Sequence, residues 1–292
     1  MNGILLIDKP QEWTSHDVVA KLRGLLKERR IGHAGTLDPM ATGLLTIFVG
    51  RATRAAEFAE AEEKTYIARL RLGVVTDTQD ITGRVLRECE AEVSQAMLEA
   101  VLPRFLGEIL QVPPMYSAIK VDGQRLYKLA RQGVEVERRA RPVTIHRLAV
   151  LGRVDGDFEL EITCSKGTYI RTLCHDIGEV LGCGGTMSAL RRTAVGAFSA
   201  ADACTLAEIE ASDDRAAFLR PLDALFAGYP DLTVDVGQER GIRNGQTVRL
   251  DAGHPGRVRV YGVSGAFLAL GEVVVSREIV LRMVKRFFEV GV

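Results

Sequence analysis

The chain has 292 residues, of which 47% are hydrophobic and 26% charged, so it is long enough for a sizeable core and has an ordinary globular composition. Its 38 Lys and Arg balance 38 Asp and Glu, and the overall charge therefore gives no reason to expect nucleic-acid binding. The five cysteines lack metal-binding spacing, the N-terminus does not resemble a signal peptide, and no apolar run reaches the ~20 residues of a membrane span. We therefore expect a soluble, cytoplasmic protein with free, packed thiols and no metal.

Strand and helix patterns alternate along the first 228 residues. Apolar or alternating runs predict strands, and apolar residues at helical spacing predict helices. The expected strands cover residues 3–10, 44–50, 64–73, 158–167 and 189–200. The expected helices cover residues 14–30, 53–61, 92–104 and 168–182, and a helical connector covers 204–228. From about residue 229, glycines separate short β-type runs, which predicts a small all-β module.

The loop GHAGTLDPMATG, residues 32–43, carries a single carboxylate, Asp38, directly before Pro39. A residue before proline is biased towards extended backbone angles, so this step projects its side chain from a stiff elbow. Gly35 and Gly43 leave room for the close approach of backbone or a ligand. An Asp-Pro step on its own is most often a surface turn, so the loop alone does not establish a catalytic residue.

The sequence around this loop resembles the TruB family of pseudouridine synthases. GHAGTLDPMATGLL is similar to the family's signature loop, in which the aspartate is catalytic. Further blocks follow the family's order through nearly all of the first 200 residues or so: DKPQEWTSHDVV, KTYIARLRLGVVTDTQDITG, PPMYSAIKVDGQRLYKLARQGVEVERRARPV, CSKGTYIRTLCHDIG and SALRRTAVG. The resemblance implies an α/β (α+β) fold with a mixed, largely antiparallel sheet. It also implies an isomerase that converts uridine 55 in the T loop of tRNA to pseudouridine.

This chemistry requires no cofactor, because the base leaves C1′, rotates and rejoins through C5 without redox or added atoms. With an ordinary pKa of ~3.9, Asp38 is ionised at neutral pH and can attack C1′ or accept the 2′ proton; the sequence leaves both roles open. The resemblance implies that Tyr66 stacks on the target base near its C5 proton and that Arg171 pairs with Asp38. Without the resemblance, Tyr66 would be interpreted as an ordinary strand tyrosine, and Arg171 as a solvent-facing arginine on a helix.

The resemblance also implies a set of substrate-binding residues. His33 is expected to stack where the flipped uridine had been, and Leu190 to pack under the base. Lys64, Lys166 and Tyr169 are expected in the same pocket. A lone loop histidine has no such meaning by itself, and the histidines together with Cys174 lack the spacing of metal ligands.

Residues 119–147 hold eight Lys and Arg against three Asp and Glu. A charge run is most often a solvated face, but this one is interleaved with apolar and aromatic residues and flanked by prolines. The resemblance implies a mobile arm, at about residues 114–141, that closes over the RNA backbone. We expect four of its cations to contact phosphates: Lys120, Arg125, Lys128 and Arg131.

Residues 229–292 resemble, more loosely, the PUA RNA-binding module, and an OB-like or other small barrel is the alternative. We place the domain boundary after residue 228. The expected protein is a stand-alone monomer that acts on the T arm of tRNA without an obligatory protein partner. Two alternatives stay open: a guide-dependent enzyme of the dyskerin type, and a non-catalytic RNA-binding or tRNA-folding protein. Compact length favours the stand-alone form, and the set of Asp38, Tyr66 and Arg171 favours catalysis.

Overall fold

The computed structural model describes residues 1–117, 119–121 and 123–288, and the side chains of Lys120 and Arg131 lie outside the described part. A nine-stranded sheet has the order β1-β3-β12-β4-β11-β10-β7, with β2 paired to β3 and β13 to β12. Its strands are β1 (Gly3–Lys9), β2 (Ile31–Ala34), β3 (Thr42–Val49), β4 (Lys64–Leu72), β7 (Gly107–Gln111), β10 (Arg141–Val154), β11 (Asp157–Cys164), β12 (Gly185–Val195) and β13 (Phe198–Ser199). β12 and β3 run parallel and the other neighbours are antiparallel, which confirms the expected mixed, largely antiparallel sheet.

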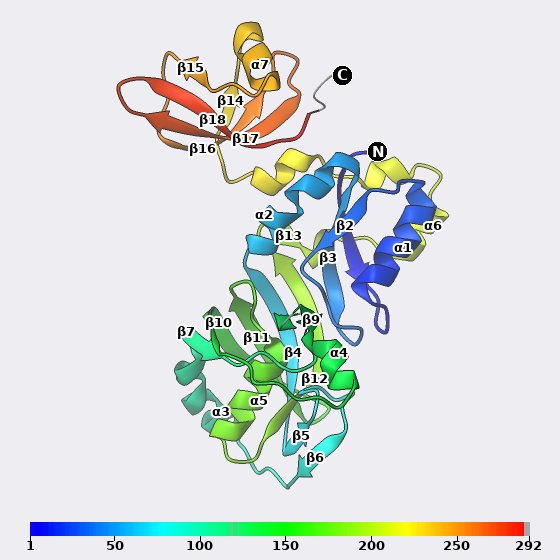
Figure 1. Ribbon diagram of the computed structural model, residues 1–292. Coiled ribbons are helices and arrows are strands. Elements are labelled where there is room, and N and C mark those ends of the chain that lie inside the picture. Colours follow the sequence, from blue (N-terminus) through cyan, green and yellow to red (C-terminus); the bar gives the residue numbers. More distant parts are fainter. Residues whose placement is uncertain (118, 122, 289–292) are drawn as a thin grey trace.

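Helices and two hairpins surround this sheet (Figure 1). The α-helices are α1 (Ser15–Leu26), α2 (Ala56–Ala61), α3 (Gln95–Val101), α4 (Leu126–Arg131), α5 (Ile170–Val180) and α6 (Leu206–Ala211). The hairpins are β5 (Val74–Thr76) with β6 (Val85–Glu88), and β8 (Lys120–Val121) with β9 (Gln124–Arg125). The second hairpin and α4 form the structured part of the predicted arm.

A short parallel contact between β3 and β12 joins the two halves of the sheet. Arg191 pairs with Thr42, and Arg192 pairs with Gly43. Gly43 has φ +96°, and a Cβ there would lie 2.3 Å from the Arg192 carbonyl oxygen. Only glycine fits this approach of backbone to backbone, so the end of the signature loop is fixed by the sheet itself.

Several sequence-based expectations were wrong in detail. His33 was expected in a loop but lies on strand β2. The connector at 204–228 is helical as expected, but in short pieces: the α-helix α6 is followed by two 3₁₀ turns, η4 (Arg215–Phe218) and η5 (Leu222–Phe226). Cys89 is exposed, so it is not a packing residue.

A five-stranded sheet, in the order β14-β16-β17-β18-β15, follows the connector. Its strands are β14 (Asp231–Thr233), β15 (Val248–Leu250), β16 (Gly256–Tyr261), β17 (Phe267–Val275) and β18 (Ile279–Arg286). The expected all-β character is wrong at one point, because helix α7 (Val236–Arg243) lies between β14 and β15. An Asp235 capping box starts this helix, which glycine spacing alone did not reveal.

Aromatic side chains attach this second sheet to the first. Phe226 of η5 contacts Phe58 of α2 with ring centroids 5.3 Å apart, and it also meets Phe267 at 6.0 Å and Phe287 at 5.8 Å. The Tyr261 hydroxyl donates to Asp223 at 2.6 Å. The C-terminal sheet therefore shares a hydrophobic cluster with the first sheet.

Candidate active site

Asp38 lies on the loop between β2 and β3, and the start of α1 holds this loop in place. The Ser15 hydroxyl donates to the Leu37 carbonyl at 3.2 Å and accepts from the Leu37 amide at 3.0 Å. On the other side of Asp38, the Pro39 carbonyl accepts from the Glu12 amide at 2.8 Å. The predicted elbow is thus fixed on both sides of its carboxylate.

Lys9 reinforces the same elbow from β1. Its side chain is fully buried, and its Nζ donates to the carbonyls of Pro39 at 3.2 Å, Pro10 at 2.8 Å and Trp13 at 2.6 Å. Burial lowers the pKa of Lys9 to about 8. Sequence reasoning missed this residue, although a lysine that ends a buried strand beside a proline is a recognisable signal.

Arg171, in the first turn of α5, meets Asp38 through its guanidinium. Its Nε lies 3.0 Å from Oδ2 of Asp38, and Nη2 donates to Oδ1 at 3.5 Å. Nη2 also donates to the Tyr116 carbonyl at 2.9 Å, and Nη1 donates to the Thr78 carbonyl at 3.1 Å. Arg171 is only 6% exposed, so the alternative of a solvent-facing helix arginine is wrong.

Asp80 is a second carboxylate of this site, and sequence reasoning did not select it. Its Oδ2 lies 3.3 Å from Nη1 of Arg171, and its Oδ1 accepts from the hydroxyls of Thr78 and Thr82 at 2.9 and 2.5 Å. The side chain is buried on the turn between β5 and β6. Asp80 therefore orients the guanidinium from the side opposite Asp38.

The Asp38 carboxyl group is held between opposing influences. Burial raises its pKa above the ordinary value, Arg171 lowers it, and the nearby charge of Asp80 raises it; the outcome is a raised pKa. The side chain still keeps 38% of its surface exposed. Asp38 is thus surrounded by protein on the Arg171 side and remains accessible to solvent on its other side.

Tyr66 and Leu190 lie on the neighbouring central strands β4 and β12. The register pairs Tyr66 with Arg192 and Ala68 with Leu190, so these four side chains share one face of the sheet. Tyr66 and Leu190 are buried in one cluster that also contains Leu37 of the signature loop. The structure therefore brings these two predicted residues together beside the Asp38 loop.

Arg192 is a buried cation, 1% exposed, that sequence reasoning did not single out. Its Nε donates to the Leu44 carbonyl at 2.7 Å and its Nη2 to the Gly35 carbonyl at 2.9 Å. Burial raises the pKa of the Tyr66 hydroxyl, and the charge of Arg192 opposes that shift. Arg192 thus ties the start of the signature loop to the central strands and places a positive charge beside Tyr66.

His33 and Lys64 lie at the edge of the same region. Burial lowers the pKa of His33 to about 4, so its ring is neutral at physiological pH, and it meets the His16 ring edge-on with centroids 5.5 Å apart. The Lys64 ammonium donates to the carbonyls of Glu60 and Glu62, both at 2.6 Å. This ammonium therefore secures the end of α2, and the assignment of Lys64 to substrate binding stays a prediction.

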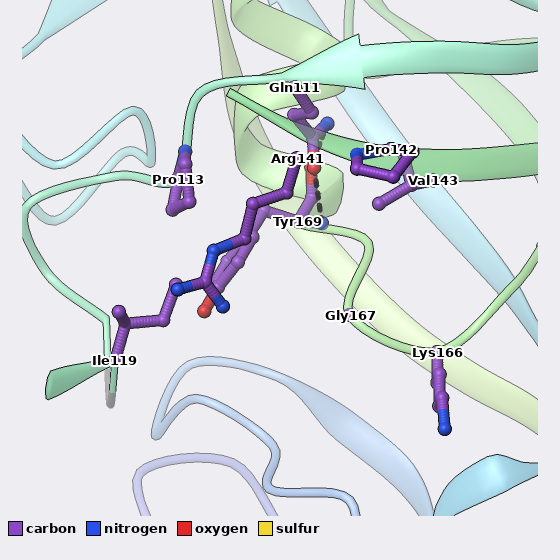
Figure 2. A pocket seen from close by; sticks show the side chains of 9 residues that line it. All are labelled: Gln111, Pro113, Ile119, Arg141, Pro142, Val143, Lys166, Gly167 and Tyr169. Atoms are coloured by element: carbon purple, nitrogen blue, oxygen red, sulfur yellow. Dashed lines mark hydrogen bonds between the residues drawn. The ribbon is translucent and has the colours of Figure 1, made fainter. Parts of the chain in front are cut away.

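A cavity of about 220 Å³ adjoins the site where the arm leaves β7 and returns as β10 (Figure 2). Tyr169 and Lys166, both predicted to bind substrate, are among its lining residues. The Gln111 amide donates to the Tyr169 carbonyl at 3.0 Å and accepts from the Tyr169 amide at 2.7 Å, which fixes the start of α5. Arg125 and Lys128 of the arm are both exposed, and their contact with RNA phosphates stays a prediction.

The site combines an oriented carboxylate with several buried cations. Such a set can activate a hydroxyl or attack an electrophilic carbon while favouring an anionic leaving group. Within the described ranges, no group of three or more His, Cys, Asp and Glu side chains is arranged to hold a metal ion. None of the helices in that part of the chain is long and apolar enough to cross a membrane.

Comparison with known proteins gives consistent matches along the chain. The family model described as TruB family pseudouridylate synthase (N terminal domain) matches residues 23–170, and that of the tRNA pseudouridylate synthase B C-terminal domain matches residues 171–227. The tRNA pseudouridine synthase B of Aromatoleum aromaticum is 45% identical over 275 residues, which cover 93% of this chain and 89% of that protein. The enzyme of the same name from Clostridium kluyveri is 41% identical over 292 residues, which cover 98% and 100%.

Solved structures share the fold. A chain from the crystal structure of a Cbf5-Nop10-Gar1 complex gives a TM-score of 0.73 at 25% identity and covers 98% of this chain and 85% of that chain. A chain from the structure of an H/ACA RNP bound to a substrate RNA containing 2′-deoxyuridine gives the same TM-score at 23% identity, with the same coverage. The superposition extends over both sheets, because 98% of this chain is included.

Proposed function

The chain belongs to the TruB family of pseudouridylate synthases, and from this premise we propose that it isomerises uridine 55 in the T loop of tRNA. It is a tRNA pseudouridine synthase, an isomerase, as its relatives at 41–46% identity are named. The position of the uridine and recognition of the T arm are the finer part of the proposal. The observation that supports the proposed isomerisation is the pairing of Arg171 with Asp38, whose loop is held on both sides of the carboxylate.

In the proposed reaction the bond between N1 and C1′ breaks and the base leaves the ribose. Asp38 either attacks C1′ or takes the 2′ proton, and its partly exposed carboxylate is compatible with both. The detached base rotates and its C5 bonds to C1′, which breaks the ester bond to Asp38 in the first route or is accompanied by return of the proton from Asp38 to C2′ in the second. The C5 proton then leaves and N1 gains a proton, so atoms and charge balance and Asp38 is regenerated. Tyr66 stacks on the base and stands nearest the C5 proton in this scheme.

The buried cations support the same assignment. A base that leaves with the bonding electrons of N1 is an anion until it is protonated, and positive charge stabilises it. Arg192 lies beside Tyr66, where the base is placed by the proposal, and its side chain is hydrogen-bonded to backbone carbonyls. Leu190 on the same face packs under the base, and the neutral ring of His33 occupies the gap left in the RNA.

A stand-alone enzyme is preferred to a guide-dependent one. The relatives named tRNA pseudouridine synthase B are 41–46% identical over more than nine tenths of the chain, whereas the Cbf5-containing complex matches at 25%. The proposal therefore includes no guide RNA and no obligatory protein partner. It places the enzyme in the cytoplasm as a monomer, with residues 1–228 as the catalytic domain and residues 229–292 as a PUA-like RNA-binding domain.

The test uses a tRNA transcript tritiated at C5 of uridine, incubated with purified protein alone. Release of tritium without guide RNA is the expected result, and a transcript with cytidine at position 55 should release only the background level. The Asp38→Asn protein is the matched negative control. Release that is unchanged by the cytidine substitution would refute the assignment to position 55, and release that requires added guide RNA would favour the dyskerin-type alternative.

A further inference from the structure

We propose that the cavity beside Tyr169 binds the phosphodiester adjoining the target uridine, with Arg141 as its principal contact. This subsite rests on the proposed function, since it serves an RNA whose uridine reaches Asp38. Figure 2 shows the Arg141 and Tyr169 side chains running alongside one another towards Ile119, while Lys166 extends from the far side of the loop that carries Gly167.

The cavity is built on fixed elements. Arg141 is the first residue of β10 and pairs with Gln111 at the end of β7. Gln111 in turn holds the backbone of Tyr169 through two hydrogen bonds. Pro113 and Val143 are buried and supply apolar walls. Arg141 therefore projects from a positioned strand end into a shaped cavity.

The charges in the cavity are not neutralised. Arg141 and Lys166 are exposed, and neither has a carboxylate within ion-pair distance among the residues that the structure describes. The arm's neighbouring Arg138 differs, because it pairs with Glu135 at 3.0 Å and donates to the Pro113 carbonyl at 3.2 Å. An unpaired guanidinium in a cavity favours an anionic ligand, and its planar set of N–H donors matches the oxygens of a phosphate.

Tyr169 connects this cavity to the catalytic carboxylate. Burial raises the pKa of its hydroxyl, the charges of Arg171 and Arg141 lower it, and Asp38 raises it. Tyr169 directly precedes α5, whose Arg171 pairs with Asp38 at 3.0 Å, and Tyr169 lines the same cavity as Arg141. An RNA whose ribose meets Asp38 continues through a phosphodiester on each side of that ribose, and the cavity offers one of them an anion site.

The test combines Arg141 variants with singly neutralised RNA. A T-arm stem-loop is prepared with one methylphosphonate at a time at each linkage around the target uridine, and kcat/KM for pseudouridine formation is measured. With the wild type, a methylphosphonate at one of the linkages next to the target should lower kcat/KM about tenfold. Arg141→Ala should lower kcat/KM about tenfold on the unmodified RNA. In this variant, methylphosphonate at that linkage should not lower kcat/KM any further. Arg141→Lys should recover part of the loss, since it keeps the charge without the fork.

A second readout separates substrate contact from a structural role. Arg141→Ala should reduce the slope of log K against log salt by about 0.7, the value for a single phosphate neutralised in single-stranded RNA, and should leave the melting temperature unchanged. Arg104→Ala is the matched control, because Arg104 is an exposed arginine on the 3₁₀ turn η2 (Leu102–Phe105), and it should leave both quantities unchanged.

The possible outcomes test the subsite separately from the proposed function on which it depends. If the losses from Arg141→Ala and from every methylphosphonate multiply independently, or if Arg141→Ala behaves as wild type, the subsite is refuted. Wild-type protein that forms no pseudouridine in tRNA would refute the proposed function instead. Wild-type activity on unmodified RNA, together with cancellation of the two losses at a single linkage, supports both.

Discussion

Replacing Arg171 should slow catalysis, and the loss of rate should be larger the fewer of its guanidinium contacts the new side chain can replace. Arg171→Lys keeps one positive charge but cannot reproduce the paired contacts of 3.0 and 3.5 Å to the two oxygens of Asp38. Hydrogen bonds to charged groups contribute about 1.5–3 kcal/mol, which corresponds to a loss of roughly 10- to 100-fold in the chemical step. Arg171→Met removes the charge too, and its loss should exceed that of the lysine variant.

The stability cost should come mainly from Asp80 rather than from Asp38. The Asp80 side chain is 6% exposed, whereas that of Asp38 is 38% exposed and is partly stabilised by water. Removal of one partner from a buried pair typically costs about 3–5 kcal/mol, which would lower the melting temperature of a domain of this size by roughly 10 °C. Arg171→Met should therefore melt lower than Asp38→Asn, which leaves the contact between Arg171 and Asp80 intact.

The pH dependence of the rate should show in which direction Arg171 shifts the pKa of Asp38. Asp38 acts as a carboxylate and its pKa is raised by burial, so the rate should fall as the pH drops through that raised pKa rather than near the ordinary value. Arg171 lowers the pKa of Asp38. Without its charge the acid limb should move to higher pH in Arg171→Met, and less so in Arg171→Lys.

The assay is single-turnover pseudouridine formation at saturating enzyme across a range of pH, with filter binding of tRNA and thermal melting in parallel. The experiment is conducted below the melting temperature of the weakest variant. An Arg171→Met protein that is folded and has the wild-type rate and acid limb would refute the claim that Arg171 controls Asp38. A fall in tRNA affinity that accounts for the whole loss would show that Arg171 acts on binding instead.

Three further outcomes are expected. Asp38→Asn should abolish detectable turnover while tRNA affinity falls little, because affinity rests on phosphates and RNA shape; equal loss of binding and turnover would make Asp38 a structural turn residue. Arg125→Ala combined with Lys128→Ala should reduce the salt slope of tRNA binding by about 0.7–0.9 for each phosphate that these cations neutralise, and an unchanged slope would remove both from the interface. Truncation after residue 228 should leave a folded catalytic domain with weaker tRNA binding, but it uncovers Phe226, which contacts Phe267 and Phe287, so calorimetry should show a lower melting temperature; an unfolded product would mean that the second sheet completes the core.

The sequence predicted the elements that carry a local pattern. Alternating residues identified β4, and the helical spacing around Arg171 identified α5, within a few residues of their observed bounds. The missed helix α7 begins at a capping box among glycines, where β-type runs on either side dominate the pattern. His33 was misplaced because β2 has only four residues, too few for a period to be visible.

The candidate site was only partly accessible from sequence, because pairing partners are a property of the fold. The elbow of Asp38 was predictable from Asp-Pro, but its anchors Ser15 and Lys9 reach it only through tertiary structure. Asp80 sits in a loop rich in Asp and Thr, and nothing in that composition distinguishes it from Asp77, which accepts from the backbone amide of its own loop at Arg84. Contact with Arg171, more than ninety residues later in the chain, is what selects Asp80.

The positive charge of the site was hidden for the same reason, in a chain whose net charge is +0. Lys9, Lys64 and Arg192 are buried, and their hydrogen bonds run to backbone carbonyls. A carbonyl dipole satisfies a donor but does not cancel its charge, whereas the carboxylates of Asp38 and Asp80 face Arg171. The interior around the Asp38 loop thus keeps an excess of positive charge. That excess suits a reaction in which the base departs as an anion and must be retained until its C5 rejoins the ribose.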